Sequence, residues 1–260
     1  MTERDRSPEA ATRTATPTRT VVVTGGGRGI GRATCLAAAR DGWAVCVDYA
    51  RDAGSAASVV EAIRALGGTA CAVQADVAEE ADVVRLFETV DREMPPLGGL
   101  VNNAGIVDRA ARVEEIDRAR LERIFATNVY SAFACAREAV RRLKGRGGAI
   151  VNVSSVAARL GGAGQYVDYA ATKGAMDTFT TGLALELARD GIRVNAVRPG
   201  IIATEIHASG GQPDRAERLA SGIPMARPGT AEEVAEAIVW LLSERAAYTT
   251  GTLLDVAGGR

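Results

Sequence analysis

Tyr169 and Lys173, in the segment VDYAATKGAM (167–176), are spaced for proton-transfer chemistry. A tyrosine with its ordinary pKa of about 10 is almost inert as an acid or base at neutral pH. On a helix, residues four apart share one face, with Cβ atoms about 5–6 Å apart. An ammonium about 4 Å from the phenol, at an effective dielectric of about 20, would supply the roughly 4 kcal/mol that brings this pKa to about 7. We therefore expect Tyr169 to donate or accept a proton, whereas Tyr166 does not share the face of Lys173.

A second group of residues with a chemical use is the glycine-rich segment TGGGRGIGRA (24–33). Gly25, Gly29 and Gly31 form the pattern T-G-x-x-x-G-x-G, which differs from the usual G-x-G-x-x-G fingerprint. The physics is the same, because glycines allow a tight turn between strand and helix and let a ligand approach the backbone. A helix that begins near Ile30 would direct its free N–H groups at a pyrophosphate. The segment therefore predicts a dinucleotide site.

These two groups need a frame that brings them together, and the rest of the chain predicts one. Short runs rich in Val and Ile alternate with longer helical patterns from residue 20 onward. The runs are apolar throughout, which is typical of strands buried on both faces of a parallel sheet. We predict a single-domain α/β fold of the Rossmann type, a doubly wound parallel sheet of about seven strands with helices on both faces. The predicted strands are 20–24, 44–48, 69–75, 99–103, 149–154, 193–197 and 252–256, and the predicted helices are 29–41, 55–66, 79–93, 117–143, 165–190 and 230–243.

Two segments fall outside this alternation. Residues 199–229 are long, irregular and rich in Gly and Pro, and connections of that length in compact domains are usually functional. We expect a mobile substrate lid over 201–227, in which His207 faces solvent. Residues 1–19 hold two prolines and no apolar core of the kind found in secretory signals, so we expect a flexible tail ahead of a domain over 20–260.

Composition argues against several functional classes. The 260 residues include 31 basic and 32 acidic side chains, so the net charge of −1 gives no reason to expect nucleic acid or an anionic membrane as partner. No apolar run approaches the ~18 residues of a membrane span. Four separated cysteines without a C-x-x-C pair, and a single histidine, predict no metal site and no disulfides. We expect a cytoplasmic protein that acts on a small molecule.

Six motifs resemble those of the short-chain dehydrogenase/reductase family, in the same order, and the resemblance covers residues 20–260. They are TGGGRGIG at 24–31, NNAG at 102–105, Asn128 in TNVYSAF, VNVSS at 151–155, YAATK at 169–173 and VRPG at 197–200. Each motif alone is weak, but the ordered series is specific for the family. The resemblance implies an NAD(P)(H)-dependent oxidoreductase that transfers a hydride between nicotinamide and a carbonyl or secondary alcohol, with Tyr169 as general acid or base.

The resemblance also implies roles for the residues around Tyr169. Ser155 would hydrogen-bond the substrate carbonyl oxygen, and Asn128 would position Lys173 through a water. Ser154 and Ser155 are adjacent at a strand end and so point to opposite faces. We choose Ser155 because the family's serine usually follows the strand. The expected catalytic residues are Asn128, Ser155, Tyr169 and Lys173.

The dinucleotide would lie along the carboxyl edge of the sheet. By resemblance, Asp76 and Val77 border the adenine, the backbone of Ile202 faces the carboxamide, Thr204 contacts the cofactor and Lys173 holds the nicotinamide ribose. The expected cofactor-binding residues are Gly25, Arg28, Gly29, Ile30, Gly31, Tyr49, Arg51, Asp76, Val77, Asn103, Ala104, Gly105, Tyr169, Lys173, Pro199, Gly200, Ile202 and Thr204.

The choice between NADP(H) and NAD(H) depends on the end of the second strand. Asp48 lies there, but the acid typical of NAD-preferring relatives would fall one place later, at Tyr49. Such an acid hydrogen-bonds the ribose of NAD, whereas arginine suits the 2′-phosphate of NADP. Arg28 and Arg51 can both approach that phosphate. We expect NADP(H), with NAD(H) as the alternative.

The sequence leaves other functions open. A dinucleotide-binding sensor or scaffold without turnover is the main alternative, although it would have no chemical need for the full catalytic set. An imine or enone reductase would use the same residues on a different acceptor. The helices at 117–143 and 165–190 resemble those that pack across a two-fold axis in the family, which implies a homotetramer or a homodimer. Pocket walls over 155–168, where Tyr166 would contribute, and 201–227 indicate a modest, mainly apolar carbonyl or alcohol substrate.

Overall fold

A computed structural model describes residues 18–260, which build a seven-stranded sheet with every neighbouring pair of strands parallel. The strand order is β3-β2-β1-β4-β5-β6-β7, so the winding reverses between β1 and β4. In open α/β sheets, the crevice outside the carboxyl ends of the strands at this reversal holds the ligand. The strands are β1 Thr20–Val23, β2 Ala44–Tyr49, β3 Ala70–Gln74, β4 Leu97–Asn102, β5 Gly148–Val153, β6 Ile192–Pro199 and β7 Leu253–Val256.

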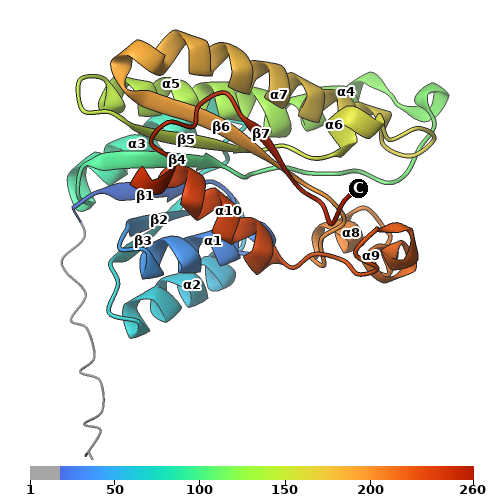
Figure 1. Cartoon of the computed structure of the whole chain (residues 1–260), viewed down its shortest axis with the longest axis horizontal. Helices are drawn as coiled ribbons and strands as arrows, with labels where there is room; N and C mark the ends of the chain where they lie inside the picture. The colour runs from blue at the N-terminus through green and yellow to red at the C-terminus, as the bar shows by residue number, and fades with distance from the viewer. Residues whose placement is uncertain (1–17) are drawn as a thin grey trace, which may run out of the picture.

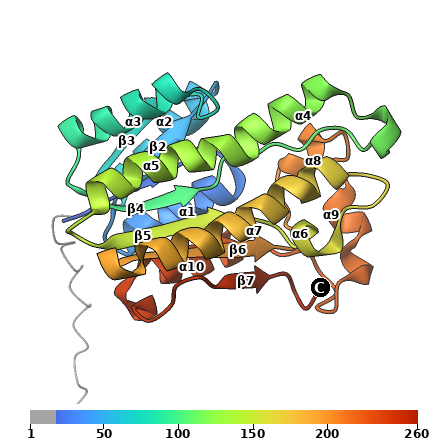
Figure 2. The same ribbon diagram turned by 90° about the horizontal axis from the view of Figure 1, so that it is seen from above.

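Helices cover both faces of the sheet (Figures 1 and 2). α1, α2 and α10 pack on one face, and α3, α5 and α7 pack on the other. This arrangement confirms the doubly wound Rossmann-type fold predicted from the sequence. The helices are α1 Gly29–Arg40, α2 Ala53–Ala65, α3 Glu80–Glu93, α4 Arg118–Phe125, α5 Ser131–Leu143, α6 Ala157–Leu160, α7 Val167–Leu187, α8 Ile206–Ser209, α9 Arg215–Arg218 and α10 Ala231–Leu242.

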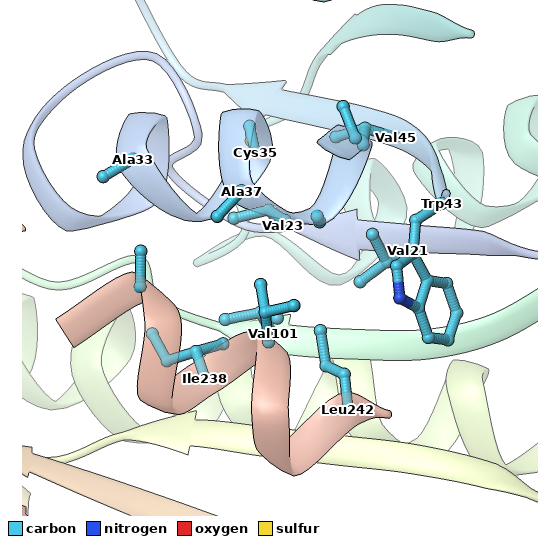
Figure 3. Packing of buried hydrophobic residues seen from close by; sticks show 14 of the residues in the cluster. Val21, Val23, Ala33, Cys35, Ala37, Trp43, Val45, Val101, Ile238 and Leu242 are labelled. Carbon is cyan, nitrogen blue, oxygen red and sulfur yellow. The ribbon is translucent and has the colours of Figure 1, made fainter. Parts of the chain in front are cut away.

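The apolar strand runs are explained by burial on both faces. Val21 and Val23 of β1 face α1 and α10, where Ile238 and Leu242 pack against them (Figure 3). Val22, between them in sequence, belongs to the core on the opposite face. Each of these valines is fully buried. Apolar side chains on both faces suit an interior strand covered by helices, and β1 is one, paired with β2 on one side and β4 on the other.

One predicted helix differs from the structure in a way that affects the site. The pattern over 117–143 predicts a continuous helix, but α4 and α5 are joined by a π-helical turn over Ala126–Tyr130. A π turn inserts an extra residue into a helix, and the 3.6-residue hydrophobic pattern does not reveal it. Asn128 lies in this turn and is buried.

The segments outside the regular alternation are partly helical. The expected lid over 201–227 contains the short helices α8 and α9, which lie beside α6 at the carboxyl end of the sheet (Figures 1 and 2). The tail expected over 1–19 lies outside the described residues except for Thr18 and Arg19. The carbonyl of Arg19 accepts a hydrogen bond from Ala44 N (3.0 Å). No helix within residues 18–260 is long and apolar enough to cross a membrane.

Candidate active site

A cavity of about 990 Å³ lies along the carboxyl edge of the sheet. Residues at or just after the ends of β1 to β6 line it, together with residues of the segment 201–227. One end is bordered by Tyr49 and Arg51 after β2, and the other by Ser155 and Tyr169. The structure therefore joins the glycine turn and the Tyr-Lys segment in one continuous site.

The cavity includes all the sequence-predicted site residues except two. Gly31 and Asn128 lie behind its wall. A Cβ on Gly31 would lie 2.3 Å from Gly25 O and 2.6 Å from Asn103 Nδ2, so this glycine is required by packing within the turn. Gly31 therefore lets the turn close tightly, and its expected part in cofactor binding stays a prediction.

The glycine turn is held from below by the segment after β4. Asn103 Nδ2 donates to Thr24 O (2.8 Å) and to Gly25 O (3.1 Å). Thr24 Oγ1 accepts from the backbone N–H groups of Asn103 (3.0 Å) and Ala104 (2.9 Å). Gly25 and Gly29 have φ of 62° and 51°, a conformation that favours glycine. The NNAG motif therefore fixes the shape of the turn in addition to lining the cavity.

Asp48 closes the other side of the same turn. Its Oδ2 accepts a hydrogen bond from Gly25 N (3.1 Å), and the side chain is buried. Burial raises the pKa of Asp48 to about 7, although the hydrogen bond from Gly25 opposes this shift. Tyr49, on the opposite side of the strand, packs partly against the α1 side of the core and also lines the cavity. The acid at the end of β2 thus supports the turn.

Tyr169 and Ser155 meet at the far end of the cavity. Tyr169 is half-buried in the first turns of α7, and Ser155 follows β5. The Ser155 hydroxyl lies close enough to Tyr169 to lower the pKa of the phenol, which favours its ionised form. Ser155 Oγ also accepts from Ala157 N (3.1 Å), which leaves its own hydroxyl proton free to point at Tyr169. Ser154 points the other way, is buried and donates to Lys173 O (3.1 Å).

Lys173 follows Tyr169 by one turn of α7, as the spacing predicts, but its ammonium group is directed elsewhere. Nζ donates to Val153 O (2.7 Å) and lies 5.5 Å from the centroid of the Tyr169 ring. A Cβ on Gly105 would lie 3.6 Å from Nζ and 3.5 Å from Asn128 Oδ1, so Gly105 lies next to both groups. Lys173 therefore stands between β5 and the cavity.

The pKa expected for Tyr169 must be corrected. Burial raises the pKa of Tyr169 to about 12, and the hydrogen bond from Ser155 only reduces that shift. Burial also lowers the pKa of Lys173 to about 8, opposed by the negative charge of Asp177. The expectation of a tyrosine pKa of about 7 counted the attraction between the two groups and left out the cost of removing each from water. These protein groups alone keep the phenol protonated at neutral pH.

Asn128 reaches α7 through Thr172. Its Nδ2 donates to Ile106 O (2.9 Å) and to Thr172 Oγ1 (3.1 Å), and its Oδ1 accepts from Ile106 N (2.8 Å). Thr172 Oγ1 in turn donates to Tyr169 O (2.7 Å). Asn128 thus joins the segment after NNAG to the helix that carries Tyr169 and Lys173.

A buried ion pair that sequence reasoning missed lies next to Tyr169. Arg120 Nε donates to Asp168 Oδ2 (2.7 Å), and Arg120 Nη1 donates to Arg109 O (2.8 Å). The Asp168 side chain is fully buried. The pair links α4 and the loop at Arg109 to the first turn of α7, so it holds the start of that helix. Because 48 residues separate the two partners, no local pattern could have shown the contact.

Asp177 is a second residue that was missed, and here the sequence contained a signal. It lies four residues after Lys173 on α7, the same spacing that relates Lys173 to Tyr169. Its Oδ2 accepts from Arg198 Nη2 (2.7 Å) and Nε (3.0 Å). Asp177 is the charged group that raises the pKa of Lys173 against the effect of burial.

We expect the substitution Asp177→Asn to move the alkaline limb of the pH profile of kcat/KM by about one pH unit toward lower pH. Without the carboxylate the pKa of Lys173 falls further below about 8, so the amine loses its proton at a lower pH. Asp255→Asn is the matched control, since Asp255 pairs with the same Arg198 (3.6 Å) but is not among the groups that shift the pKa of Lys173. An equal shift in both variants, or none in Asp177→Asn, would contradict this assignment.

The cavity fits an extended dinucleotide. The backbone of the glycine turn lines the middle of the cavity. Arg28 and Arg51 lie at one end of the cavity, and the hydroxyl groups of Ser155 and Tyr169 lie at the other. Thr204 lies against Gly29, where a Cβ would be 3.5 Å from Thr204 Cγ2. Such a site suits a ligand with phosphates in its middle and a reacting ring near Tyr169.

Comparisons with known proteins agree with this geometry. Residues 25–260 match a family model described as enoyl-(acyl carrier protein) reductase. The chain is 55% identical over 243 residues to the uncharacterized oxidoreductase YgfF of Escherichia coli, which covers 92% of this chain and 98% of that protein. It is 37% identical over 243 residues to 3-oxoacyl-(acyl-carrier-protein) reductase FabG of Staphylococcus aureus, covering 93% of this chain and 98% of that protein. The chain is also 37% identical over 278 residues to a glucose and ribitol dehydrogenase homolog of Oryza sativa, covering 98% of this chain and 91% of that protein.

Proposed function

The chain belongs to the short-chain dehydrogenase/reductase family of oxidoreductases, and we propose that it uses NADP(H) to transfer a hydride between nicotinamide and a carbonyl or secondary alcohol. The observation that carries the proposal is the placement of Ser155 and Tyr169 on one wall of the cavity, where the serine hydroxyl lowers the pKa of the phenol, with Lys173 one turn further along α7. Two hydroxyl groups directed at one point, next to a buried cation, suit an oxygen that gains negative charge.

When bound, the nicotinamide supplies the hydride for reduction or accepts it in oxidation. A carbonyl oxygen between Ser155 Oγ and Tyr169 Oη accepts hydrogen bonds from both groups, and Tyr169 gives it a proton as charge develops there. A pKa of about 12 keeps the phenol protonated at neutral pH, so the protein side chains favour the donor role. Lys173, with a pKa of about 8, is mostly charged at neutral pH and stabilises the phenolate that remains.

The proposal is tested by a substrate panel with both reduced dinucleotides. The panel holds β-ketoacyl thioesters, sugars, steroids, quinones and small ketones, and the readout is oxidation of the dinucleotide. Turnover of at least one carbonyl compound, faster with NADPH than with NADH, is the expected result. Tight dinucleotide binding without turnover of any compound would favour the sensor or scaffold function instead.

Arg28 and Arg51 support the choice of NADP(H). Both line the end of the cavity next to Tyr49, and both are exposed, so their charges can meet a ligand without breaking internal contacts. The nearby carboxylate of Asp52 is already engaged, since it caps α2 by accepting from Ser55 N (3.0 Å) and Ser55 Oγ (2.5 Å). An arginine next to a 2′-phosphate forms the stronger, charge-assisted kind of hydrogen bond.

We expect Arg51→Ala to lower kcat/KM for NADPH by about tenfold, while kcat/KM for NADH stays within about twofold. The loss corresponds to one charge-assisted hydrogen bond of about 1.5–3 kcal/mol. Arg28→Ala should act in the same direction, and Arg64→Ala on the far end of α2 is the control. A wild-type preference for NADH, or equal losses with both dinucleotides, would overturn the NADP(H) assignment.

Reduction of an enone is the second candidate, and the description of the matching family model favours it. The names of the FabG relatives favour reduction of a carbonyl in an acyl thioester. The products separate the two reactions, because an enone substrate gives an allylic alcohol in one case and a saturated ketone in the other. We propose carbonyl reduction because the hydroxyl groups of Ser155 and Tyr169 lie close together on the cavity wall, where both can donate to one carbonyl oxygen.

We further propose that the enzyme works as a homotetramer or homodimer in the cytoplasm. Tyr130, Phe133 and Leu185 are more than half exposed on α5, α7 and the turn before α5. The ring of Phe133 stacks on Phe179, with centroids 3.9 Å apart, so the exposed apolar surface is continuous between the two helices. A surface of this kind suits packing against a second copy.

Four free cysteines among the described residues fit the reducing conditions of the proposed cytoplasmic location.

A further inference from the structure

The lid places an arginine over the substrate end of the cavity. Arg215, in α9, lines the same cavity as Ser155, Tyr166 and Tyr169. Its guanidinium stacks on the Tyr166 ring, 5.0 Å from the ring centroid. Tyr166 immediately precedes α7 and is three residues from Tyr169. The positive charge therefore lies beside the reacting end of the site rather than at the end that takes the adenosine.

Neutral groups hold this guanidinium in place. Arg215 Nη1 donates to Gln165 Oε1 (2.6 Å) and to Gln212 Oε1 (3.2 Å). Gln212 Nε2 in turn donates to Tyr166 Oη (2.7 Å). Among residues 18–260, no carboxylate that the structure describes forms an ion pair with Arg215. Carboxamide oxygens and an aromatic face orient the guanidinium and leave its charge unneutralised.

The other charged groups of this region are arranged differently. Arg123 also lines the cavity, but it is paired with Asp108. Glu205 lies near the glycine turn, 3.6 Å from the position of a Cβ on Gly29. Arg260 is a further residue of the wall, and its backbone oxygen accepts a hydrogen bond from Arg159 Nη2 (2.9 Å). Arg215 is thus the lining arginine that the structure places directly on the ring of Tyr166.

We propose that Arg215 binds an oxyanion group of the substrate, so that the enzyme acts on oxo acids or hydroxy acids that carry a carboxylate or phosphate away from the reacting carbon. The inference rests on the proposed function and narrows its substrate class. An oriented guanidinium at the edge of an apolar pocket recognises such a group with two parallel hydrogen bonds. Arg215 is a specificity residue in this account, and the chemistry stays with Ser155, Tyr169 and Lys173.

The test compares acids with their own methyl esters. Levulinate, longer-chain methyl-ketone acids, para-acetylbenzoate and a phosphorylated hydroxyketone are assayed with NADPH, each acid against its methyl ester and the phosphate against the free alcohol. We expect the wild type to prefer the best anionic substrate by at least about tenfold in kcat/KM. Arg215→Gln should reduce the preference to about one, through a higher KM for the anion alone, and Arg215→Lys should restore part of it. Comparing the preference for the carboxylate substrates with the preference for the phosphate substrate shows which oxyanion is bound.

Arg218→Gln is the matched control. Arg218 also donates to Gln212 Oε1 (2.7 Å) but is exposed and does not line the cavity, so its loss should leave the preference unchanged. Equal turnover of acids and esters by the wild type, or an equal loss of both in Arg215→Gln, would overturn the inference and leave Arg215 as a lid contact. Binding of para-acetylbenzoate to the NADPH complex is measured by calorimetry in parallel. Binding that depends on Arg215 without any turnover would overturn the proposed reaction and support the anion site.

Discussion

Replacing Tyr169 with phenylalanine is expected to lower kcat for carbonyl reduction by about a thousandfold, because positioned general acids contribute about 10²–10⁴ in rate. The ring of Tyr169 would still pack at the cavity wall beside Lys173, but the substrate oxygen would have no proton donor. The Kd for NADPH should change by less than about threefold, since the glycine turn is held by Asp48, Thr24 and Asn103 and not by the phenol hydroxyl. Stopped-flow turnover and calorimetric titration of the dinucleotide measure the two effects separately.

Tyr166→Phe is the control for this substitution. It removes a hydroxyl group from the same cavity, but that group accepts a hydrogen bond from Gln212 and is not bonded to Ser155. We expect a loss in kcat of less than about tenfold. If Tyr169→Phe kept more than about a tenth of the activity, or if Tyr166→Phe were the more damaging change, the assignment of Tyr169 as the acid would be wrong.

The second large effect is expected at Gly31. A Cβ at this position would lie 2.3 Å from Gly25 O and 2.6 Å from Asn103 Nδ2, so even alanine forces the glycine turn and the segment after β4 apart. Overpacking of this kind costs about 1–3 kcal/mol of the free energy of unfolding. Because both displaced groups shape the dinucleotide site, Gly31→Ala should also weaken NADPH binding by at least about tenfold. Denaturant titration and calorimetry give the two numbers.

Gly54→Ala separates this packing effect from a general effect of replacing a helical glycine. Gly54 lies in α2, is exposed, and a Cβ there would have only an ordinary contact with Asp52 Oδ1 at 3.6 Å. We expect its stability to stay equal or to rise slightly, since alanine is the better helix former. Full stability and full NADPH affinity in Gly31→Ala would mean that the turn tolerates a side chain, contrary to the close approach seen here.

The sequence predicted the frame well because the relevant signals are local. The apolar runs at β1, β2, β4, β5 and β6 lie within about two residues of their predicted bounds, since strands buried on both faces leave a continuous apolar pattern. The spacing of Tyr169 and Lys173 likewise predicted a shared position on α7. The Ser155 hydroxyl lowers the pKa of Tyr169, whereas Ser154 donates to Lys173 O, so the geometry supports the choice of Ser155, which stays a prediction.

Three features of the site could not be predicted because they depend on the surroundings. The pKa of Tyr169 is set chiefly by burial, which no residue spacing reveals. The π turn that contains Asn128 lies between two α-helices, and its sequence pattern does not distinguish it from them. The contact of Arg215 with Tyr166 joins a lid whose sequence indicated only an irregular segment rich in Gly and Pro. Each of these results from tertiary packing rather than from local sequence.

The most direct test of the central claim follows the hydride itself. A ketone that the enzyme turns over is reduced with NADPH carrying deuterium in place of its transferable hydride, and the product is analysed by mass spectrometry and NMR. The account predicts one deuterium per product molecule, bonded to the carbon that had been the carbonyl carbon, with a solvent-derived proton on the oxygen. Deuterium at any other carbon, or a product without deuterium, would contradict hydride transfer to a carbonyl held by Ser155 and Tyr169.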